Sequence, residues 1–134
     1  MMISTKGRYA LRALSDLADH EEGVYVPLKD IAERQNISHK YLESIMLMLV
    51  QNNLVEGASG KKGGYKLKKS PQNISLGEVL RITEGGLEPV ACISDRNTPC
   101  ERYEECNTYP IWKGLYDVIN DYLNSKNLTD IMER

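Results

Sequence analysis

The chain has 134 residues, 27% of them charged, and a formal net charge of −2. This length suits one domain with appendages and a real hydrophobic core, and the acidic balance excludes a generally basic nucleic-acid coat protein. No apolar run is long enough to cross a bilayer and no hydrophobic signal core opens the chain, so we expect a cytoplasmic protein.

The first predicted element is a helix from Ser4, a good N-cap, to about His20. Its first half is basic, because it carries Lys6, Arg8 and Arg12. Cations near a helix N-terminus oppose the macrodipole, so these side chains form either a solvated face or, as we expect for Arg8, a contact to a nucleic-acid backbone. The other side is apolar at helical spacing, with Ala10, Leu11, Leu14, Leu17 and Ala18.

A short strand at residues 24–26 and a helix that opens after Pro27 come next. The helical pattern breaks at residues 35–38. Asn36 tolerates the left-handed backbone of a tight turn, Ile37 can enter the core, and Ser38 suits an N-cap. The sequence therefore predicts two helices joined by a short turn.

The second of these helices has apolar residues from Leu42 to Leu49 on one face and a polar leading end. This arrangement is typical of the helix-turn-helix that reads DNA. The candidate DNA contacts are Ser38, His39, Lys40, Tyr41, Glu43 and Ser44.

A basic β-hairpin is predicted directly afterwards, with strands at residues 54–56 and 65–67 and a glycine-rich loop at 57–64. Lys61 and Lys62 lie at its tip, and no acidic residue interrupts residues 57–70. Taken alone, the lysines fit a solvated surface hairpin. After a helix-turn-helix, they predict a wing that contacts phosphates, and its candidate residues are Ser59, Lys61, Lys62 and Tyr65.

After the wing, Ser75 caps a predicted helix that runs to Thr83, with Glu78 at the capping-box position. The next segment, up to residue 108, has little periodicity and holds all three cysteines: Cys92, Cys100 and Cys106. An odd number of cysteines argues against a disulfide framework, so metal binding or redox chemistry is favoured. Structural zinc prefers shorter Cys-x2–4-Cys pairs, which this segment lacks.

A last long helix is predicted from about Tyr109 to Asn124, and a final helical turn near Leu128 is capped by Asn127 or Thr129. The apolar stripe of the long helix is wide for a helix that packs only on its own small domain, so we expect this helix to form a dimer interface. The expected interface residues are Ile111, Trp112, Leu115, Val118, Ile119 and Tyr122. The opposite side is expected to be solvated, with Lys113, Asp117, Asn120, Asp121 and Asn124.

The chain resembles a family of bacterial winged helix-turn-helix transcriptional regulators that includes IscR, NsrR, RirA and CymR. The matching motifs are STKGRYA at residues 4–10, Ile37-Ser38 with Tyr41-Leu42-Glu43, Gly63-Gly64-Tyr65, and ISLGEVLRITE at residues 74–84. The resemblance implies a homodimer on a pseudo-palindromic operator, with the long C-terminal helices crossing at the interface.

Carried over by position, the resemblance places Ser38, Lys40, Tyr41 and Glu43 in the major groove and the wing in the minor groove. Members often have an arginine just before the first wing glycine, where this chain has Ser59. Lys61 or Lys62 would replace that arginine only as point charges.

The same resemblance implies that Cys92, Cys100 and Cys106 hold an iron–sulfur cluster, either [2Fe–2S] or [4Fe–4S], because thiolates are its usual ligands. IscR-like members have a histidine three residues after the third cysteine, where this chain has Tyr109. The fourth ligand is left open between the partner subunit, solvent and the candidates Asp95, Glu101, Glu104, Glu105 and Asn107.

We therefore expect a mainly α protein with a small β-hairpin, divided into a DNA-binding domain (1–85), a sensor loop (86–108) and a dimerisation helix with its tail (109–134). The function favoured is a transcriptional regulator whose operator affinity is set by the cluster. The alternatives are a cluster-free regulator controlled by cysteine oxidation or by a protein partner, and a zinc-stabilised winged helix. No convergent set of nucleophile, acid and base indicates an enzyme.

Overall fold

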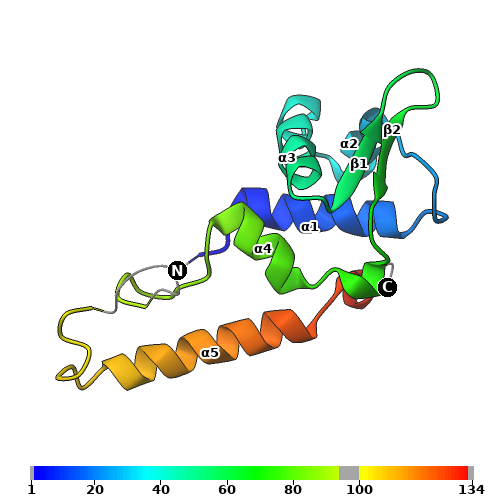
Figure 1. Cartoon of the computed structure of the whole chain (residues 1–134). Helices are drawn as coiled ribbons and strands as arrows, with labels where there is room; N and C mark the ends of the chain where they lie inside the picture. The colour runs from blue at the N-terminus through cyan, green and yellow to red at the C-terminus, as the bar shows by residue number, and fades with distance from the viewer. Residues whose placement is uncertain (1, 94–99, 133–134) are drawn as a thin grey trace.

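The computed structural model describes residues 2–93 and 100–132 and is mainly α-helical with one small hairpin, as the sequence predicts (Figure 1). Within this part, the N-terminal half contains α1 (Thr5–Ala18), α2 (Leu28–Gln35), α3 (His39–Gln51), β1 (Val55–Ala58) and β2 (Gly64–Leu67). The rest contains a 3₁₀ turn η1 (Pro71–Asn73), α4 (Leu76–Glu84), the long α5 (Tyr109–Ser125) and a second 3₁₀ turn η2 (Leu128–Ile131). No described helix is long and apolar enough to span a bilayer.

The core lies where α1, α2 and α3 pack against one another and against the base of the hairpin. The apolar faces predicted for these helices are buried, and their largest fully buried side chains are Leu14, Ile31, Leu42, Ile45, Met46 and Leu49. Helix α1 ends at Ala18, slightly earlier than predicted.

One ion pair inside this core ties α1 to α2. Asp16 is only 5% exposed and is the buried charged residue of the described chain. Arg34 donates from Nε to Oδ2 at 3.0 Å and from Nη2 to Oδ1 at 2.8 Å, and Gln35 donates to Oδ2 at 3.0 Å. Burial opposes ionisation of Asp16, but these hydrogen bonds outweigh it, so the pKa of Asp16 is lowered.

The turn between α2 and α3 has the predicted chemistry. Asn36 adopts the left-handed conformation at φ 53°, and Ile37 is 5% exposed. The Ser38 hydroxyl accepts the Tyr41 backbone N–H at 3.2 Å and so caps α3. These local interactions fix the direction in which the leading end of α3 points.

The hairpin is antiparallel, with Val55 opposite Leu67 and Ala58 opposite Gly64, so β1 runs further into the glycine-rich segment than predicted. The strand predicted at residues 24–26 is reduced to a single bridge between Val26 and Tyr65. Gly64 has φ +144°, and a Cβ on it would lie 2.2 Å from the carbonyl oxygen of Val26. Only glycine fits between the hairpin and this bridge.

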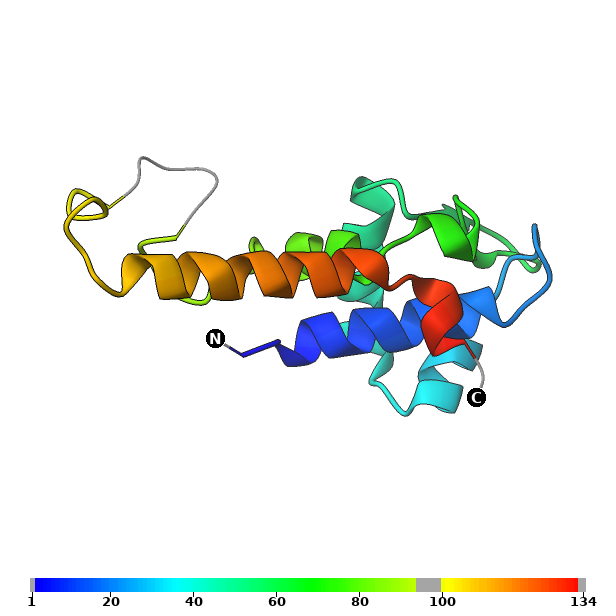
Figure 2. The same ribbon diagram turned by 90° about the horizontal axis from the view of Figure 1, so that it is seen from below.

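Helix α4 contacts both α1 and α5, and so connects the N-terminal half to the long C-terminal helix (Figure 2). Ser75 caps α4 as predicted, but the capping box is not closed, because the Glu78 carboxylate accepts a hydrogen bond from Lys69 at 2.8 Å. Helix α5 begins at Tyr109, close to the predicted start. The predicted last turn is η2, where Asn127 and Asp130 form a capping box.

The face of α5 that was predicted to be solvated also carries a contact to α4. Asn120 is half-buried, Asn124 is exposed as predicted, and both accept hydrogen bonds from Arg81. Tyr116, which the apolar pattern did not single out, is the buried residue of this helix. The side of α5 that packs on its own chain is therefore partly polar.

Candidate nucleic-acid interface and cysteine loop

The polar residues at the leading end of α3 are exposed, while Leu42 among them is buried in the core. The structure leaves all six residues predicted there open to solvent: Ser38, His39, Lys40, Tyr41, Glu43 and Ser44. His39 lies 3.9 Å from the Glu43 carboxylate, and the Ser44 hydroxyl donates to the Tyr41 carbonyl at 2.7 Å. A surface of donors and acceptors that faces outward from a helix N-terminus suits the edges of base pairs and the phosphates beside them.

Tyr41 is held in place by an aromatic contact that the sequence did not reveal. The ring of Tyr9, from α1, meets the Tyr41 ring at 5.8 Å between centroids and an interplanar angle of 73°. The Arg12 guanidinium lies 5.0 Å from the Tyr9 centroid and donates to the backbone carbonyl of Gln35 at the end of α2. The three helices of the core thus converge on the one aromatic side chain of the leading end.

The hairpin presents two kinds of lysine. Lys61 and Lys62 are exposed at the tip and take part in no ion pair within the described chain. Lys66 lies 3.1 Å from the Glu56 carboxylate, and the hydrogen bond with Glu56 raises the pKa of Lys66. Lys69 is paired with Glu78. Within the described chain, the exposed lysines of the hairpin that take part in no ion pair are therefore Lys61 and Lys62 at the tip and Lys68 at the base, whose Nζ donates to Asn53 at 3.4 Å.

The other predicted wing residues differ in exposure. Ser59 is exposed beside the tip, whereas Tyr65 is half-buried. Tyr65 exchanges two backbone hydrogen bonds with Val26, at 2.8 and 2.9 Å. Arg8 is exposed on α1, where its Nη2 donates to the Thr5 hydroxyl at 3.1 Å.

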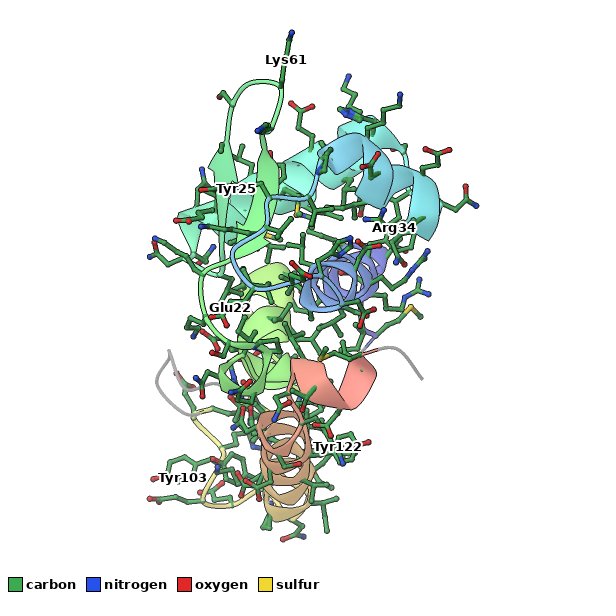
Figure 3. The ribbon with its side chains drawn as sticks, turned by 90° about the vertical axis from the view of Figure 1, so that its right-hand side faces the viewer. Glu22, Tyr25, Arg34, Lys61, Tyr103 and Tyr122 are labelled. Atoms are coloured by element: carbon green, nitrogen blue, oxygen red, sulfur yellow. The ribbon has the colours of Figure 1, made fainter. Side chains whose placement is uncertain are left out.

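The wing tip and the helix α5 lie at opposite ends of the molecule. Figure 3 places Lys61 at one end and both Tyr122, on α5, and Tyr103, in the loop before it, at the other. The candidate DNA-binding surface and the candidate dimer helix therefore do not compete for the same face.

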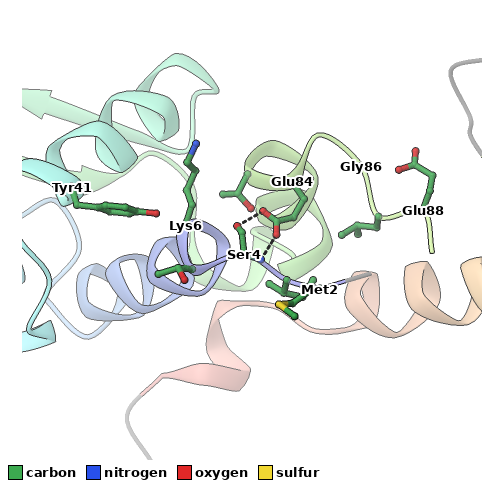
Figure 4. A pocket seen from close by; sticks show the side chains of 11 residues that line it. Met2, Ser4, Lys6, Tyr41, Glu84, Gly86 and Glu88 are labelled. Carbon is green, nitrogen blue, oxygen red and sulfur yellow. Dashed lines mark hydrogen bonds between the residues drawn. The ribbon is translucent and has the colours of Figure 1, made fainter. Parts of the chain in front are cut away.

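A cavity of about 500 Å³ lies between the leading end of α3 and the residues that follow α4, where the cysteine loop begins (Figure 4). It is bordered by Tyr41, by the start of α1 and by Glu84, Leu87 and Glu88. Glu84, the last residue of α4, accepts the Ser4 hydroxyl at 2.7 Å and also the Ser4 backbone N–H. Burial opposes ionisation of Glu84, but the hydrogen bonds from Ser4 prevail and its pKa is lowered.

All three cysteines are free thiols, with Cys92 and Cys106 half-buried and Cys100 exposed. Cys106 Sγ lies 3.2 Å from the Thr108 hydroxyl, just before α5. This contact and the backbone N–H groups of Thr108 and Tyr109 lower the pKa of Cys106. The thiolate is the form that binds metals and reacts.

The donor chemistry of this loop fits an iron–sulfur cluster, because three thiols lie between α4 and α5. The three thiols do not converge in this structure. Among the described residues, no group of three His, Cys, Asp or Glu side chains is close enough together to bind a metal ion. The ring of Tyr109, at the position of the expected histidine, lies 5.6 Å from that of Tyr103. Asp95, one of the candidate fourth ligands, falls outside the described residues.

Helix α5 exposes a continuous apolar stripe at spacings of four, three and four residues. The exposed fractions are 65% for Ile111, 42% for Leu115, 64% for Val118 and 61% for Tyr122. The other two predicted interface residues, Trp112 and Ile119, are half-buried within the single chain. Contiguous exposed apolar surfaces of this kind are typical of sites that bind another molecule.

Four residues of these sites were missed by the sequence reasoning: Tyr9, Glu84, Asp16 and Arg81. Tyr9, Glu84 and Arg81 belong to the matching motifs at residues 4–10 and 74–84, which was the available signal. Asp16 lies in neither motif, and nothing in its local sequence indicates its partner Arg34.

The chain is similar to known regulators over its full length. Residues 3–134 match the family Rrf2, described as iron-dependent transcriptional regulator. The HTH-type transcriptional regulator IscR of Pectobacterium carotovorum is 37% identical over 132 residues, which are 98% of this chain and 79% of the relative.

Two solved structures agree with this. CymR, the global cysteine regulator of B. subtilis, superposes with a TM-score of 0.79 and 33% identity, covering 98% of this chain and 95% of that one. IscR of T. potens superposes with a TM-score of 0.75 and 31% identity, covering 98% and 85%. These relatives are named as transcriptional regulators and not as enzymes, which confirms the prediction that the chain is a regulator and not an enzyme.

Proposed function

Because the chain belongs to the Rrf2 family of transcriptional regulators, we propose that it is a homodimer that binds a pseudo-palindromic operator and responds to the state of its three cysteines. The observation that carries this proposal is the exposed leading end of α3 together with the lysine tip of the wing, both remote from the apolar stripe of α5. A reading surface and a pairing surface on separate ends are what a two-fold DNA-binding dimer requires.

In the proposed complex, the leading end of α3 enters the major groove. Tyr41, braced by Tyr9, offers a hydroxyl and an aromatic edge to bases or phosphates, while Ser38, Lys40 and Glu43 supply shorter-range hydrogen bonds. Lys61 and Lys62 contact phosphates from the wing and release counterions as they do so. The paired lysines, Lys66 and Lys69, support the hairpin and contribute less to binding.

The exposed stripe of α5 forms the proposed homodimer interface. Ile111, Leu115, Val118 and Tyr122 recur at the spacing that lets two helices pack along one seam. Trp112 and Ile119 complete the edge of this surface while also packing within their own chain. A pair of such helices places the two reading heads symmetrically on the duplex.

The cysteines are the proposed sensor. Cys92, Cys100 and Cys106 would hold an iron–sulfur cluster, and Cys106 is prepared for this by its lowered pKa. When bound, the cluster would supply a centre that reacts with oxygen or nitric oxide and that is not assembled when iron is scarce. The loop residues must move to bring their thiols together, because they do not converge in the described conformation. Cluster loading would therefore change the conformation of the chain at Cys92, Cys100 and Cys106.

A route from this loop to the reading helix is available in the contacts around the cavity. Leu87 is 3% exposed, and it follows Glu84 by three residues. Glu84 holds the N-cap of α1 through Ser4, and α1 carries Tyr9, which braces Tyr41. A change in the loop can thus bias the position of the one aromatic side chain that reads DNA.

A second candidate mechanism is direct oxidation of the thiols without a cluster. The observation that favours it is Cys106, an accessible thiol whose pKa is lowered by Thr108 and by the start of α5. Hydrogen peroxide would oxidise such a thiolate to a sulfenic acid and leave hydroxide. The thiol of another loop cysteine would then attack the sulfenic sulfur, forming a disulfide and releasing water. The structural likeness to CymR is consistent with this alternative.

Anaerobic reconstitution decides between the two mechanisms. Wild type and each Cys→Ala variant are incubated with iron and sulfide, and iron, sulfide, visible absorbance and affinity for a selected operator are measured on the same samples. We expect a stoichiometric cluster in wild type, its loss in all three variants, and a change in operator affinity with it. A wild type that takes up no iron, and whose affinity changes on mild oxidation, would replace the cluster by the thiol switch.

A further inference from the structure

Arg81 of α4 holds α5 in a hydrogen-bonded clamp. Its Nη2 donates to Oδ1 of Asn120 at 2.8 Å and to Oδ1 of Asn124 at 2.7 Å. The two asparagines lie four residues apart, so one guanidinium nitrogen is shared by successive turns of α5. Because hydrogen bonds to a charged donor are directional and short, this pair of contacts fixes α5 both along its axis and about it.

The surroundings of the clamp are shaped for this one arrangement. Gly77, one turn before Arg81, is buried, and a Cβ on it would lie 2.4 Å from Oδ1 of Asn124. Asn120 donates from Nδ2 to the carbonyl of Tyr116 at 3.0 Å, which leaves its Oδ1 directed to Arg81. Tyr116 is 6% exposed. Helix α5 is therefore seated on α4 by contacts that would not survive a rotation.

The C-terminal end of α5 has a second anchor. The backbone N–H of Leu76 donates to the Lys126 carbonyl at 2.9 Å, and that of Leu128 to the Ile74 carbonyl at 3.1 Å. The N-terminal half of α5 projects beyond α4, as Figures 1 and 2 both show. The Arg81 clamp is thus the support that lies between the backbone anchor and the projecting half.

The clamp and the exposed stripe lie on opposite sides of α5. With a rotation of about 100° per residue, Asn120 and Asn124 are roughly opposite Val118 and Tyr122. The rotation of α5 that satisfies Arg81 therefore dictates the direction in which the apolar stripe faces relative to the reading head.

We propose that Arg81 is a positioning residue that sets the angle between each reading head and the dimer helix, and thereby the half-site spacing that the dimer accepts. This inference rests on the proposed function as a homodimer on a two-fold operator. In such a dimer, tilting the heads on their helices moves the two α3 helices apart or together, and half-site spacing follows from that separation.

The test compares wild type with Arg81→Ala, Arg81→Lys and the matched control Glu78→Gln. Glu78 is on the same helix, but its carboxylate pairs with Lys69. The probes are a duplex selected by the wild-type protein from a random pool, a series with one or two base pairs added or removed between the half-sites, and a single half-site. Sedimentation reports the oligomeric state, and fluorescence anisotropy reports the affinity for each duplex.

We expect wild type and Glu78→Gln to bind the altered spacings about tenfold or more weakly than the selected duplex. Arg81→Ala should remain a dimer and keep its affinity for the single half-site, but bind all spacings within a few-fold of one another. Arg81→Lys should restore part of the preference, because an ammonium group can donate to both asparagines. If Arg81→Ala does not fold, the double variant Asn120→Ala with Asn124→Ala gives the same readout without touching α4.

An Arg81→Ala dimer, or the double-asparagine dimer, with the spacing profile of wild type would overturn the role of Arg81 and leave the proposed function intact. A wild-type monomer, or a wild type that selects no two-fold duplex, would overturn the proposed function and this inference with it.

Discussion

The ring of Tyr9 meets the ring of Tyr41 edge to face, at 5.8 Å between centroids and 73° between planes. Tyr9 is half-buried in α1, whereas Tyr41 is 37% exposed at the leading end of α3. One aromatic side chain thus supports another that lies exposed at the leading end of α3. Under the proposed function, Tyr41 would contact the operator and Tyr9 would only hold it in place.

Substitution of the two tyrosines should therefore have graded effects. Tyr41→Ala is expected to weaken operator binding strongly and non-specific DNA binding little, because it removes the contact itself. Tyr9→Leu should weaken operator binding by about three- to tenfold, since an edge-to-face pair contributes about 0.5–1.5 kcal/mol. Anisotropy with the selected operator and with a scrambled duplex measures both. A Tyr9→Leu protein with wild-type affinity would show that Tyr41 needs no support.

The lysines of the wing tip should govern the salt dependence of binding. Lys61→Ala with Lys62→Ala is expected to weaken binding to operator and scrambled DNA alike, and to flatten the plot of log affinity against log salt by about 0.9 per lost phosphate contact. Lys66→Gln is the control, because it removes from the hairpin a single positive charge that is already paired with Glu56. A double variant with the wild-type slope would contradict the wing assignment.

The exposed stripe of α5 predicts which substitution breaks the dimer. Val118 is 64% exposed in the single chain, so Val118→Lys should leave the monomer folded and cost several kcal/mol when two copies meet, because the charge is buried unpaired. Asp117→Lys, at a neighbouring exposed position away from the stripe, is the control and should remain dimeric. Sedimentation at micromolar concentration distinguishes the two. Dimers of equal stability from both variants would exclude this face as the interface.

The ionisation of Asp16 makes the free energy of unfolding depend on pH. Its pKa is lowered below the usual 3.8 in the folded protein, because hydrogen bonds from Arg34 and Gln35 outweigh burial. The ionised Asp16 therefore adds its full contribution to the free energy of unfolding above pH 3.8, the usual pKa of the group. This contribution is lost as the pH falls through the lower pKa that Asp16 has in the folded protein. Asp16→Asn should reduce the unfolding free energy at neutral pH by about 2 kcal/mol. Urea unfolding between pH 7 and pH 3 should show a smaller loss for this variant than for wild type.

Tyr109 offers a gain-of-function test of the cysteine loop. The resemblance to IscR-like regulators places a histidine at this position, so Tyr109→His is expected to slow the loss of visible absorbance in air after anaerobic reconstitution. Tyr109→Phe, which keeps the ring that lies near Tyr103, is the control and should behave as wild type. Equal decay in all three proteins would remove residue 109 from the ligand environment.

The sequence by itself determined the features that depend on neighbours within a few residues. Ser4, Ser38 and Ser75 cap their helices as predicted, and Asn36 adopts the left-handed conformation of the turn. Each is a hydrogen bond or a backbone preference within one helical turn, so local residue types suffice. Apolar periodicity likewise predicted the buried faces of α1, α2 and α3.

Only the tertiary structure decided what the polar side chains do. Asn120 and Asn124 look solvated in the helical pattern, yet they accept hydrogen bonds from Arg81, 39 and 43 residues away. In the sequence, Lys66 and Lys69 belong to one basic segment. In the structure, Lys66 forms an ion pair with Glu56, and Lys69 forms one with Glu78. Periodicity separates apolar from polar faces, but a polar side chain is equally compatible with water and with a partner. The partner is set by the packing of distant segments, which is why the fold could be predicted and the clamp on α5 could not.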